Sequence, residues 1–337
     1  MRRFSFGGER VIARPAPTAG IVAAFAGIFV IWGTTYVAIA IAIQTLPPFL
    51  SAALRFALGG ALLFTWIRFR SPRPFADLPL KQTIVCGVLM SGVGNGFVVW
   101  AQQGVPSGIA ALVIAATPVA VMVLDWVAFA RQTPRLRAIV GMSLAFGGVA
   151  MIIVQGHSLS GDVRLPYLLA LLGAVSGWSV GTLLQKRVIR ADYVLAFTCV
   201  QMFAGATFLG ALSLMNREWV VFDPDSVSAA SMLAVLYLVV FGSIVASNCY
   251  LWLLAHVSAH KVTTYAVVNP VVALILGAIV LDEEVSTSTV FAAVMVLAGV
   301  ALVLFQDLKF RPGKRGQATA PTSPGATSLG RRSVSTD

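Results

Sequence analysis

Long apolar runs with almost no charge dominate the chain, and they restrict its fold more than any other feature. A helix that crosses a bilayer needs about 20 mostly apolar residues. Ten such spans are expected, at residues 19–43, 48–67, 82–102, 106–130, 136–154, 165–185, 193–215, 229–253, 261–281 and 286–305. Helices satisfy their own backbone polar groups in lipid. The pattern therefore predicts an all-α membrane protein with ten transmembrane helices, for which the lipid bilayer is the solvent.

The basic residues are distributed unevenly between the two sides of this arrangement. Of the 24 Lys and Arg residues, 21 lie in segments that share one side, whereas Arg164 and Arg217 lie on the other and Arg55 lies inside the second span. Positive residues accumulate on the cytoplasmic side of membrane proteins. We therefore expect both termini in the cytoplasm and a multi-pass protein of the cell's inner (plasma) membrane. The net charge of +11 is a topology signal, so no nucleic-acid partner is expected.

The segments outside the spans carry few signs of further function. Residues 1–18 form a basic cytoplasmic tail that we interpret as retained, because a polar, proline-containing stretch replaces the short apolar core of a signal peptide. Residues 306–337 are rich in Gly, Pro, Ser, Thr and Arg, which predicts a disordered tail. Because Cys86, Cys199 and Cys249 all fall within expected helices, no disulfide framework, metal site or cofactor is indicated.

A proline near the middle of the ninth span reveals an internal repeat. Residues 263–281 carry no charge, yet Pro270 removes a backbone donor there. A shift of 152 residues places Pro118 on Pro270, together with Gly147 on Gly299 and Trp100 on Trp252. A shift of 146 residues places Gly27 on Gly173, Trp32 on Trp178 and Gly59 on Gly205. The chain is therefore expected to consist of two five-helix units, residues 19–154 and 165–305.

Five is an odd number, so the second unit enters the membrane from the side opposite to the first. Inverted repeats with helix breaks at matching positions indicate a transporter whose binding site lies near the bilayer midplane. We therefore expect the helix breaks at Pro118 and Pro270 to free backbone carbonyls and to bend their helices around a central cavity.

Several segments resemble the EamA family of the drug/metabolite transporter superfamily. They are "FVIWGTTYVAIAIAI", "ATPVAVMVLDWVAFA" and "VVNPVVALILGAIVLDEEVS", with the glycine-containing "FGGVAMIIV" and "LAGVALVLF" after the last two. The resemblance covers about residues 20–306 as two tandem units. It implies ten helices and transport of small metabolites such as amino acids. The family's acid at the end of the ninth helix falls on Glu284 or Glu283, and its counterpart in the first unit is Arg131 or Gln132.

Polar and aromatic residues inside the spans are the candidates for the substrate site, because burying polar groups in lipid is costly. The expected substrate-binding residues are Trp32, Tyr36, Asn95, Trp178, Asn248, Trp252, Tyr265 and Asn269. An interfacial belt or simple packing is the alternative for each aromatic residue. Arg55 and Gln201 occupy equivalent positions in the two units, and snorkelling to the interface is the alternative to substrate contact for Arg55.

Two acids are candidates for ion coupling. Asp125 is the acid that lies well inside a span, and coupling or substrate binding competes there with snorkelling or pairing with a basic residue. Glu284 is the second candidate, through the family resemblance. As part of the acidic run 282–284, it is also explained by a solvated loop whose charge favours the start of the tenth helix.

The pattern as a whole predicts a carrier, and not an enzyme, that exports small amphiphilic metabolites by alternating access. A membrane-embedded enzyme is the first alternative, but "GWSVG" at 177–181 lies inside a span instead of at a strand-to-helix turn. "HVSAH" at 256–260 lacks the glutamate of a zincin motif. A passive channel or a non-transporting receptor is a further alternative, and a homodimer is left open.

Overall fold

A computed structural model describes residues 17–70, 75–129, 135–156, 165–257, 262 and 264–305. The regular secondary structure of these residues is entirely helical. In chain order the spanning segments are α1 (Thr18–Ala42), α2 (Pro48–Arg70), α3 (Leu80–Gly87) with η1 (Val88–Gly94) and α4 (Asn95–Ala101), α5 (Ser107–Ile114) with α6 (Thr117–Leu124) and η2 (Asp125–Phe129), α7 (Leu136–Gly156), α8 (Leu165–Val188), α9 (Val194–Met215), α11 (Ala229–Tyr237) with η5 (Leu238–Val245) and α12 (Ala246–His256), α14 (Tyr265–Val280) and α15 (Thr287–Leu304). Three short helices lie in connections: η3 (Ala191–Tyr193), α10 (Glu218–Val221) and η4 (Pro224–Ser226).

The expected ten-helix membrane fold is confirmed. Nine helices within the described residues are long and apolar enough to cross a bilayer, and α14 is a shorter apolar helix of 16 residues. At 1.5 Å per residue α14 is about 24 Å long, slightly less than the apolar thickness of about 30 Å. It begins at Tyr265, later than the expected start at 261, and residues 258–261 and 263 lie outside the described part. Both expected tails also lie outside it, apart from residues 17 and 18.

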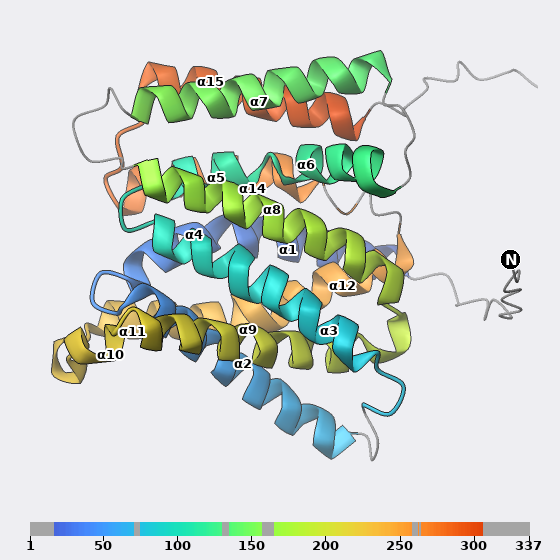
Figure 1. The fold of residues 1–337 in the computed structure, drawn as a ribbon, viewed down its shortest axis with the longest axis vertical. Coiled ribbons are helices and arrows are strands. Elements are labelled where there is room, and N and C mark those ends of the chain that lie inside the picture. The colour runs from blue at the N-terminus through green and yellow to red at the C-terminus, as the bar shows by residue number, and fades with distance from the viewer. Residues whose placement is uncertain are drawn as a thin grey trace, which may run out of the picture. The chain divides into compact units, whose positions relative to one another are not determined.

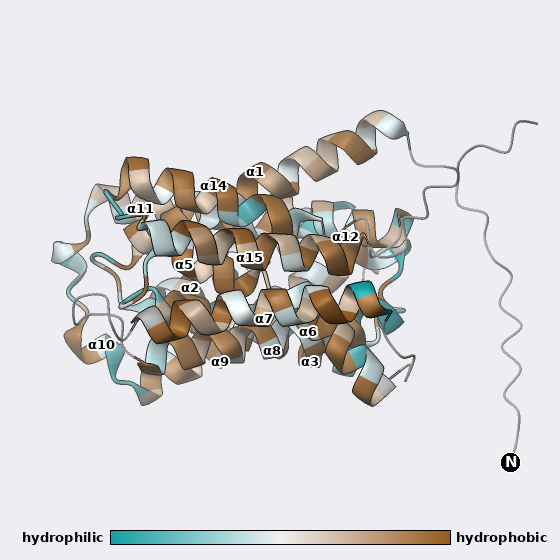
Figure 2. Cartoon of the chain, turned by 90° about the horizontal axis from the view of Figure 1, so that it is seen from above, coloured by the Kyte–Doolittle hydropathy of each residue, from teal (hydrophilic) through white to brown (hydrophobic). Residues whose placement is uncertain are grey.

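The outer surface of the helices is apolar, as a lipid-facing surface must be. Large hydrophobic side chains point outward along the spans, among them Phe69, Val127 and Ile279, which are 87%, 63% and 70% exposed. Figure 2 shows hydrophobic colour along the lengths of the helices and hydrophilic colour mainly near their ends. A soluble monomer rarely exposes contiguous apolar surface on this scale. The fold therefore belongs in a membrane.

Helices that are equivalent in the two repeats pack against each other. The fifth and tenth spans, α7 and α15, lie side by side at the top of Figure 1, and the second and seventh spans, α2 and α9, pack together in the lower part. The first span, α1, packs on α12 and α14, and its counterpart α8 packs on α4 and α6. Small residues permit the closest of these contacts: a Cβ on Gly299 would lie 2.5 Å from the Gly141 carbonyl oxygen.

Irregular helix interrupts three spans, and two of the interruptions are equivalent. The π-helical segments η1 and η5 occupy the middle of the third and eighth spans, and π-bulges frequently mark functional sites. In the fourth span α5 ends at Ile114 and α6 begins at Thr117, so the helix is interrupted just before Pro118. By contrast, α14 runs through Pro270 without a gap. Pro270 follows Tyr265 by only five residues, so the helix loses a single hydrogen bond near its start.

Candidate functional site

The helices surround a central cavity of about 130 Å³. The lining residues come from α1, α2, α4, α5, α6, α8, α9, α12 and α14 and from the π-helical segments η1 and η5. In the described part of the chain, α7 and α15 contribute nothing to the lining. An engineered cavity of about 150 Å³ holds a benzene molecule, so this volume suits a small solute. Residues of both repeats contribute to its lining.

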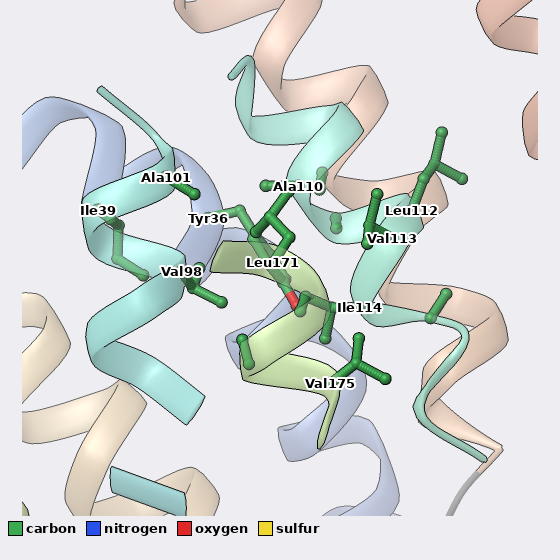
Figure 3. Packing of buried hydrophobic residues seen from close by; sticks show 14 of the residues in the cluster. Tyr36, Ile39, Val98, Ala101, Ala110, Leu112, Val113, Ile114, Leu171 and Val175 are labelled. Atoms are coloured by element: carbon green, nitrogen blue, oxygen red, sulfur yellow. The ribbon is translucent and has the colours of Figure 1, made fainter. Parts of the chain in front are cut away.

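One wall of the cavity is formed by packed apolar side chains. Ile39 of α1, Val98 of α4 and Ile114 of α5 line it, and all three belong to the buried core. Figure 3 shows Ile114 close to Leu171 and Val175 of α8, and Ile39 and Val98 together on the other side of the cluster. A substrate in this cavity therefore meets apolar surface over part of its area, as small-molecule pockets usually provide.

Three aromatic rings from three helices form a second wall. The ring centroid of Trp32 lies 5.2 Å from that of Tyr250 and 4.9 Å from that of Tyr265, and the two tyrosine rings are 6.0 Å apart. The Trp32 indole nitrogen donates to the Gly242 carbonyl at 3.4 Å, which ties α1 to η5. Edge-to-face pairs at these separations stabilise one another. The three rings thus present a preorganised aromatic surface. Tyr250, which belongs to it, was not among the residues expected from the sequence.

The structure brings six of the eight expected substrate-binding residues to the cavity: Trp32, Tyr36, Asn95, Trp178, Tyr265 and Asn269. Pro270 also lines the cavity. Pro118 does not, but its neighbour Thr117 does. The two asparagines hold backbone in place as well. Asn95 donates to the Met90 carbonyl at 2.9 Å within the π-helical region. With its amide nitrogen facing the carbonyls of Phe29 and Tyr265, Asn269 donates to each at 3.2 Å.

Asn248 and Trp252 lie outside the cavity lining. Asn248 accepts from the Thr198 hydroxyl at 3.2 Å and donates to the Ile244 carbonyl at 2.7 Å, so its amide joins α12 to α9. Trp252 packs on His256, the last residue of α12, with ring centroids 4.4 Å apart. The face of α12 that lines the cavity carries Ser247, Tyr250 and Leu251, at i, i+3 and i+4, so Asn248 and Trp252 share a different face of the same helix.

Polar side chains outside the eight expected substrate-binding residues complete the lining. Arg55 is 4% exposed, so it does not snorkel, and its Nε donates to Ser243 Oγ at 2.7 Å. Gln201, at the equivalent position of the second unit, donates to Gln185 Oε1 at 2.9 Å. Gln185 lies seven residues after Trp178 on α8, which places the two on one face. That spacing was the available signal for Gln185.

The two candidate coupling acids lie away from the cavity. Asp125 begins η2, is half-buried and does not line the cavity. Glu284 is exposed in the connection between α14 and α15. Its neighbour Glu283 instead binds the start of α5, accepting from the backbone nitrogens of Ser107 at 2.6 Å and Gly108 at 3.2 Å.

A second glutamate repeats the arrangement of Glu283. Glu218 accepts from the backbone nitrogens of Phe49 at 3.1 Å and Leu50 at 2.7 Å, at the start of α2. The residues before the two glutamates, Arg217 and Asp282, both have left-handed backbones, with φ of 56° and 53°. Each carboxylate satisfies free amides at the positive end of a helix dipole. Two carboxylates of the second unit, those of Glu218 and Glu283, thus hold the N-terminal ends of two helices of the first unit, α2 and α5.

A ten-helix bundle with paired equivalent helices around a polar and aromatic cavity defines a polytopic membrane transporter fold. Comparisons with known proteins agree. The profile of the EamA-like transporter family matches residues 18–154 and 164–305. The chain belongs to this family.

Relatives along nearly the whole length carry transporter names. The chain is 34% identical over 279 residues to the Escherichia coli (strain K12) protein named uncharacterized inner membrane transporter YedA, covering 82% of this chain and 88% of that protein. It is 26% identical over 284 residues to the probable amino-acid metabolite efflux pump of the same strain, covering 82% and 92%. A protein of known crystal structure shares the fold with a TM-score of 0.57 at 20% identity, over 84% of this chain and 96% of that one.

Proposed function

We propose that the protein exports small metabolites with a hydrophobic part, such as amino acids or other amphiphilic solutes, by alternating access of two inverted halves. The observation that carries this proposal is the central cavity, because residues of both repeats line it and polar groups lie beside apolar and aromatic walls. Binding at the interface of two repeats suits rocking of one half against the other. The inner-membrane and amino-acid descriptions of the relatives support the location and the substrate class.

In this mechanism Glu218 and Glu283 act as an outer latch, a name used here for these two carboxylates and the helix starts they hold. With cytoplasmic termini, as the basic residues favour, the starts of α2 and α5 face outward. The equivalent positions on the cytoplasmic side are Pro72 and Arg131, which supply no carboxylate. The latch therefore stabilises closure at the outer end, and release of substrate outward requires its four hydrogen bonds to break.

The alternatives make different demands on the cavity. A membrane-embedded enzyme needs a metal or a nucleophile–base pair, and the described residues contain no group of three or more His, Cys, Asp and Glu side chains that could hold a metal ion. A passive channel needs a continuous path, and its flux would rise with concentration without saturating.

Transport by the purified full-length protein in proteoliposomes tests the proposal. Efflux of radiolabelled L-leucine and L-phenylalanine should saturate and should show counterflow against unlabelled solute. Tyr265 is the lining residue chosen for substitution, because its ring packs against Trp32 in the aromatic wall. Tyr265→Ala should raise the half-saturating concentration about fivefold or more, since an aromatic contact contributes about 1 kcal/mol. Flux that does not saturate would indicate a channel instead.

A further inference from the structure

Arg55 is a buried cation without an anionic partner. It lies eight residues into α2, about 10 Å along the helix axis, and is 4% exposed. Within the described part of the chain it forms no ion pair. An arginine side chain remains charged at any physiological pH. Because an unpaired charge at membrane depth is costly, its position calls for a function.

The guanidinium is held at one nitrogen and unsatisfied at another. Its Nε donates to Ser243 Oγ at 2.7 Å, and its carbon lies 4.9 Å from the centre of the Phe56 ring. Nη1 is buried and has no hydrogen-bond partner, and Arg55 borders both the central cavity and a small void beside it. A ligand in the central cavity therefore reaches Nη1 only after a small movement of the side chain. The side chain is therefore oriented by the protein, while part of its donor capacity is left for a ligand.

A second lining residue also has a buried donor without a hydrogen-bond acceptor. Gln185 is 1% exposed, and its Oε1 accepts from Gln201, but its Nε2 has no partner. Both unsatisfied groups in the lining are thus donors. Buried donors normally find acceptors. A ligand that supplies acceptor oxygens would satisfy them, and one that brings another donor would not.

The charge of the lining points the same way. Among the described residues that line the cavity, Arg55 is the one that carries a charge, so the lining has a net positive charge. The equivalent position of the second repeat carries the neutral Gln201, which prevents a second cation from repelling the first. We propose that Arg55 binds the carboxylate of the transported solute, so that the cavity selects small monocarboxylates, zwitterionic amino acids included. This proposal rests on the carrier function proposed above.

The remaining walls fit the rest of such a solute. A planar guanidinium matches a carboxylate with two parallel hydrogen bonds. The apolar residues Ile39, Val98 and Ile114 suit a hydrocarbon side chain. No acid is present among the described lining residues to hold an ammonium group, whereas the rings of Trp32 and Tyr265 offer faces to a cation. The ammonium group of an amino acid would therefore be tolerated but not required.

The test compares matched solutes that differ only at the carboxyl group. The pairs are 4-methylpentanoate and 4-methylpentanamide, 3-phenylpropanoate and 3-phenylpropanamide, and L-leucine and L-leucinamide. Binding is measured as ligand-dependent thermal stabilisation of the full-length protein in chloride-free buffer, and flux is measured in proteoliposomes. In the wild type each carboxylate should bind at least about tenfold more tightly than its amide, as expected for a lost charge-assisted hydrogen bond.

Arg55→Gln removes the charge but keeps a donor, and it copies the residue of the other repeat. It should reduce the carboxylate preference to about twofold or less. Arg137→Gln is the matched control, because Arg137 is exposed at the start of α7. It should leave the preference unchanged. Arg55→Lys keeps the charge without the planar fork, so it should retain part of the preference. It also provides the comparison if Arg55→Gln does not fold.

The outcomes separate this proposal from the carrier function. Amides that bind as tightly as carboxylates, or a preference that persists in Arg55→Gln, would overturn the carboxylate site, and so would the absence of binding by every carboxylate. Saturable flux of the amides in those cases would leave the carrier function intact. Carboxylates that bind through Arg55 but show no saturable flux would support the site and refute the carrier.

Discussion

Glu283→Gln should weaken the outer latch and open the cavity toward the outside. The carboxylate accepts two backbone hydrogen bonds at the start of α5, at 2.6 Å and 3.2 Å. Glutamine keeps one acceptor oxygen and loses the charge, so one charge-assisted bond is lost. Such a bond contributes about 1.5–3 kcal/mol. Glu283 is half-buried, and solvent screening reduces the expected loss to about 1–2 kcal/mol.

This loss converts to a change in population. Because about 1.4 kcal/mol is a factor of ten, the ratio of outward-open to outward-closed protein should rise about 5- to 30-fold. The reporter is a Ser91→Cys substitution in a background without native cysteines, because Ser91 lines the cavity. In right-side-out vesicles, its labelling rate by a membrane-impermeant maleimide should rise by the same factor.

Glu284→Gln provides a matched control for this experiment. Glu284 is the next residue along the chain and is exposed, and the two hydrogen bonds from the start of α5 go to Glu283 instead. Its substitution removes the same charge from the same loop and should leave the labelling rate unchanged. An unchanged rate in Glu283→Gln, or an equal increase in both variants, would refute the latch and reduce Glu283 to a helix cap.

Four further outcomes are expected. Gly242→Ala should lower flux with little loss of folded protein, because the new Cβ would lie 3.1 Å from Nη2 of Arg55; normal flux would show that this side chain can move freely. Gly299→Val should instead reduce the amount of folded protein in detergent, since even a Cβ would meet backbone at 2.5 Å; a normal yield would contradict the close packing of α7 and α15. If Asp125 couples protons to transport, Asp125→Asn should abolish the dependence of flux on a pH gradient, and unchanged dependence would make Asp125 structural. A reporter fused at Asp337 should report the cytoplasm, and an exported fusion would contradict the cytoplasmic placement of both termini.

The sequence alone determined the features that depend on solvent and on local backbone chemistry. Ten apolar runs required helices, because lipid offers no partner for backbone polar groups. The alignment of Pro118 with Pro270 indicated the repeat. The expected break is found before Pro118, where α5 ends and α6 begins, but α14 runs through Pro270, because a proline near a helix start removes only one hydrogen bond. These inferences needed no knowledge of which helices touch.

The tertiary structure decided which polar residues meet. Packing turns the face of α12 with Ser247, Tyr250 and Leu251 toward the cavity, so Asn248 and Trp252 on another face of that helix lie outside it. The partners of Arg55 and Glu283 are 188 and 176 residues away along the chain, at distances that no local pattern encodes. A buried charge can be recognised in a sequence as unusual. Whether that charge snorkels to the interface, forms an ion pair or binds a ligand depends on the side chains that packing brings around it.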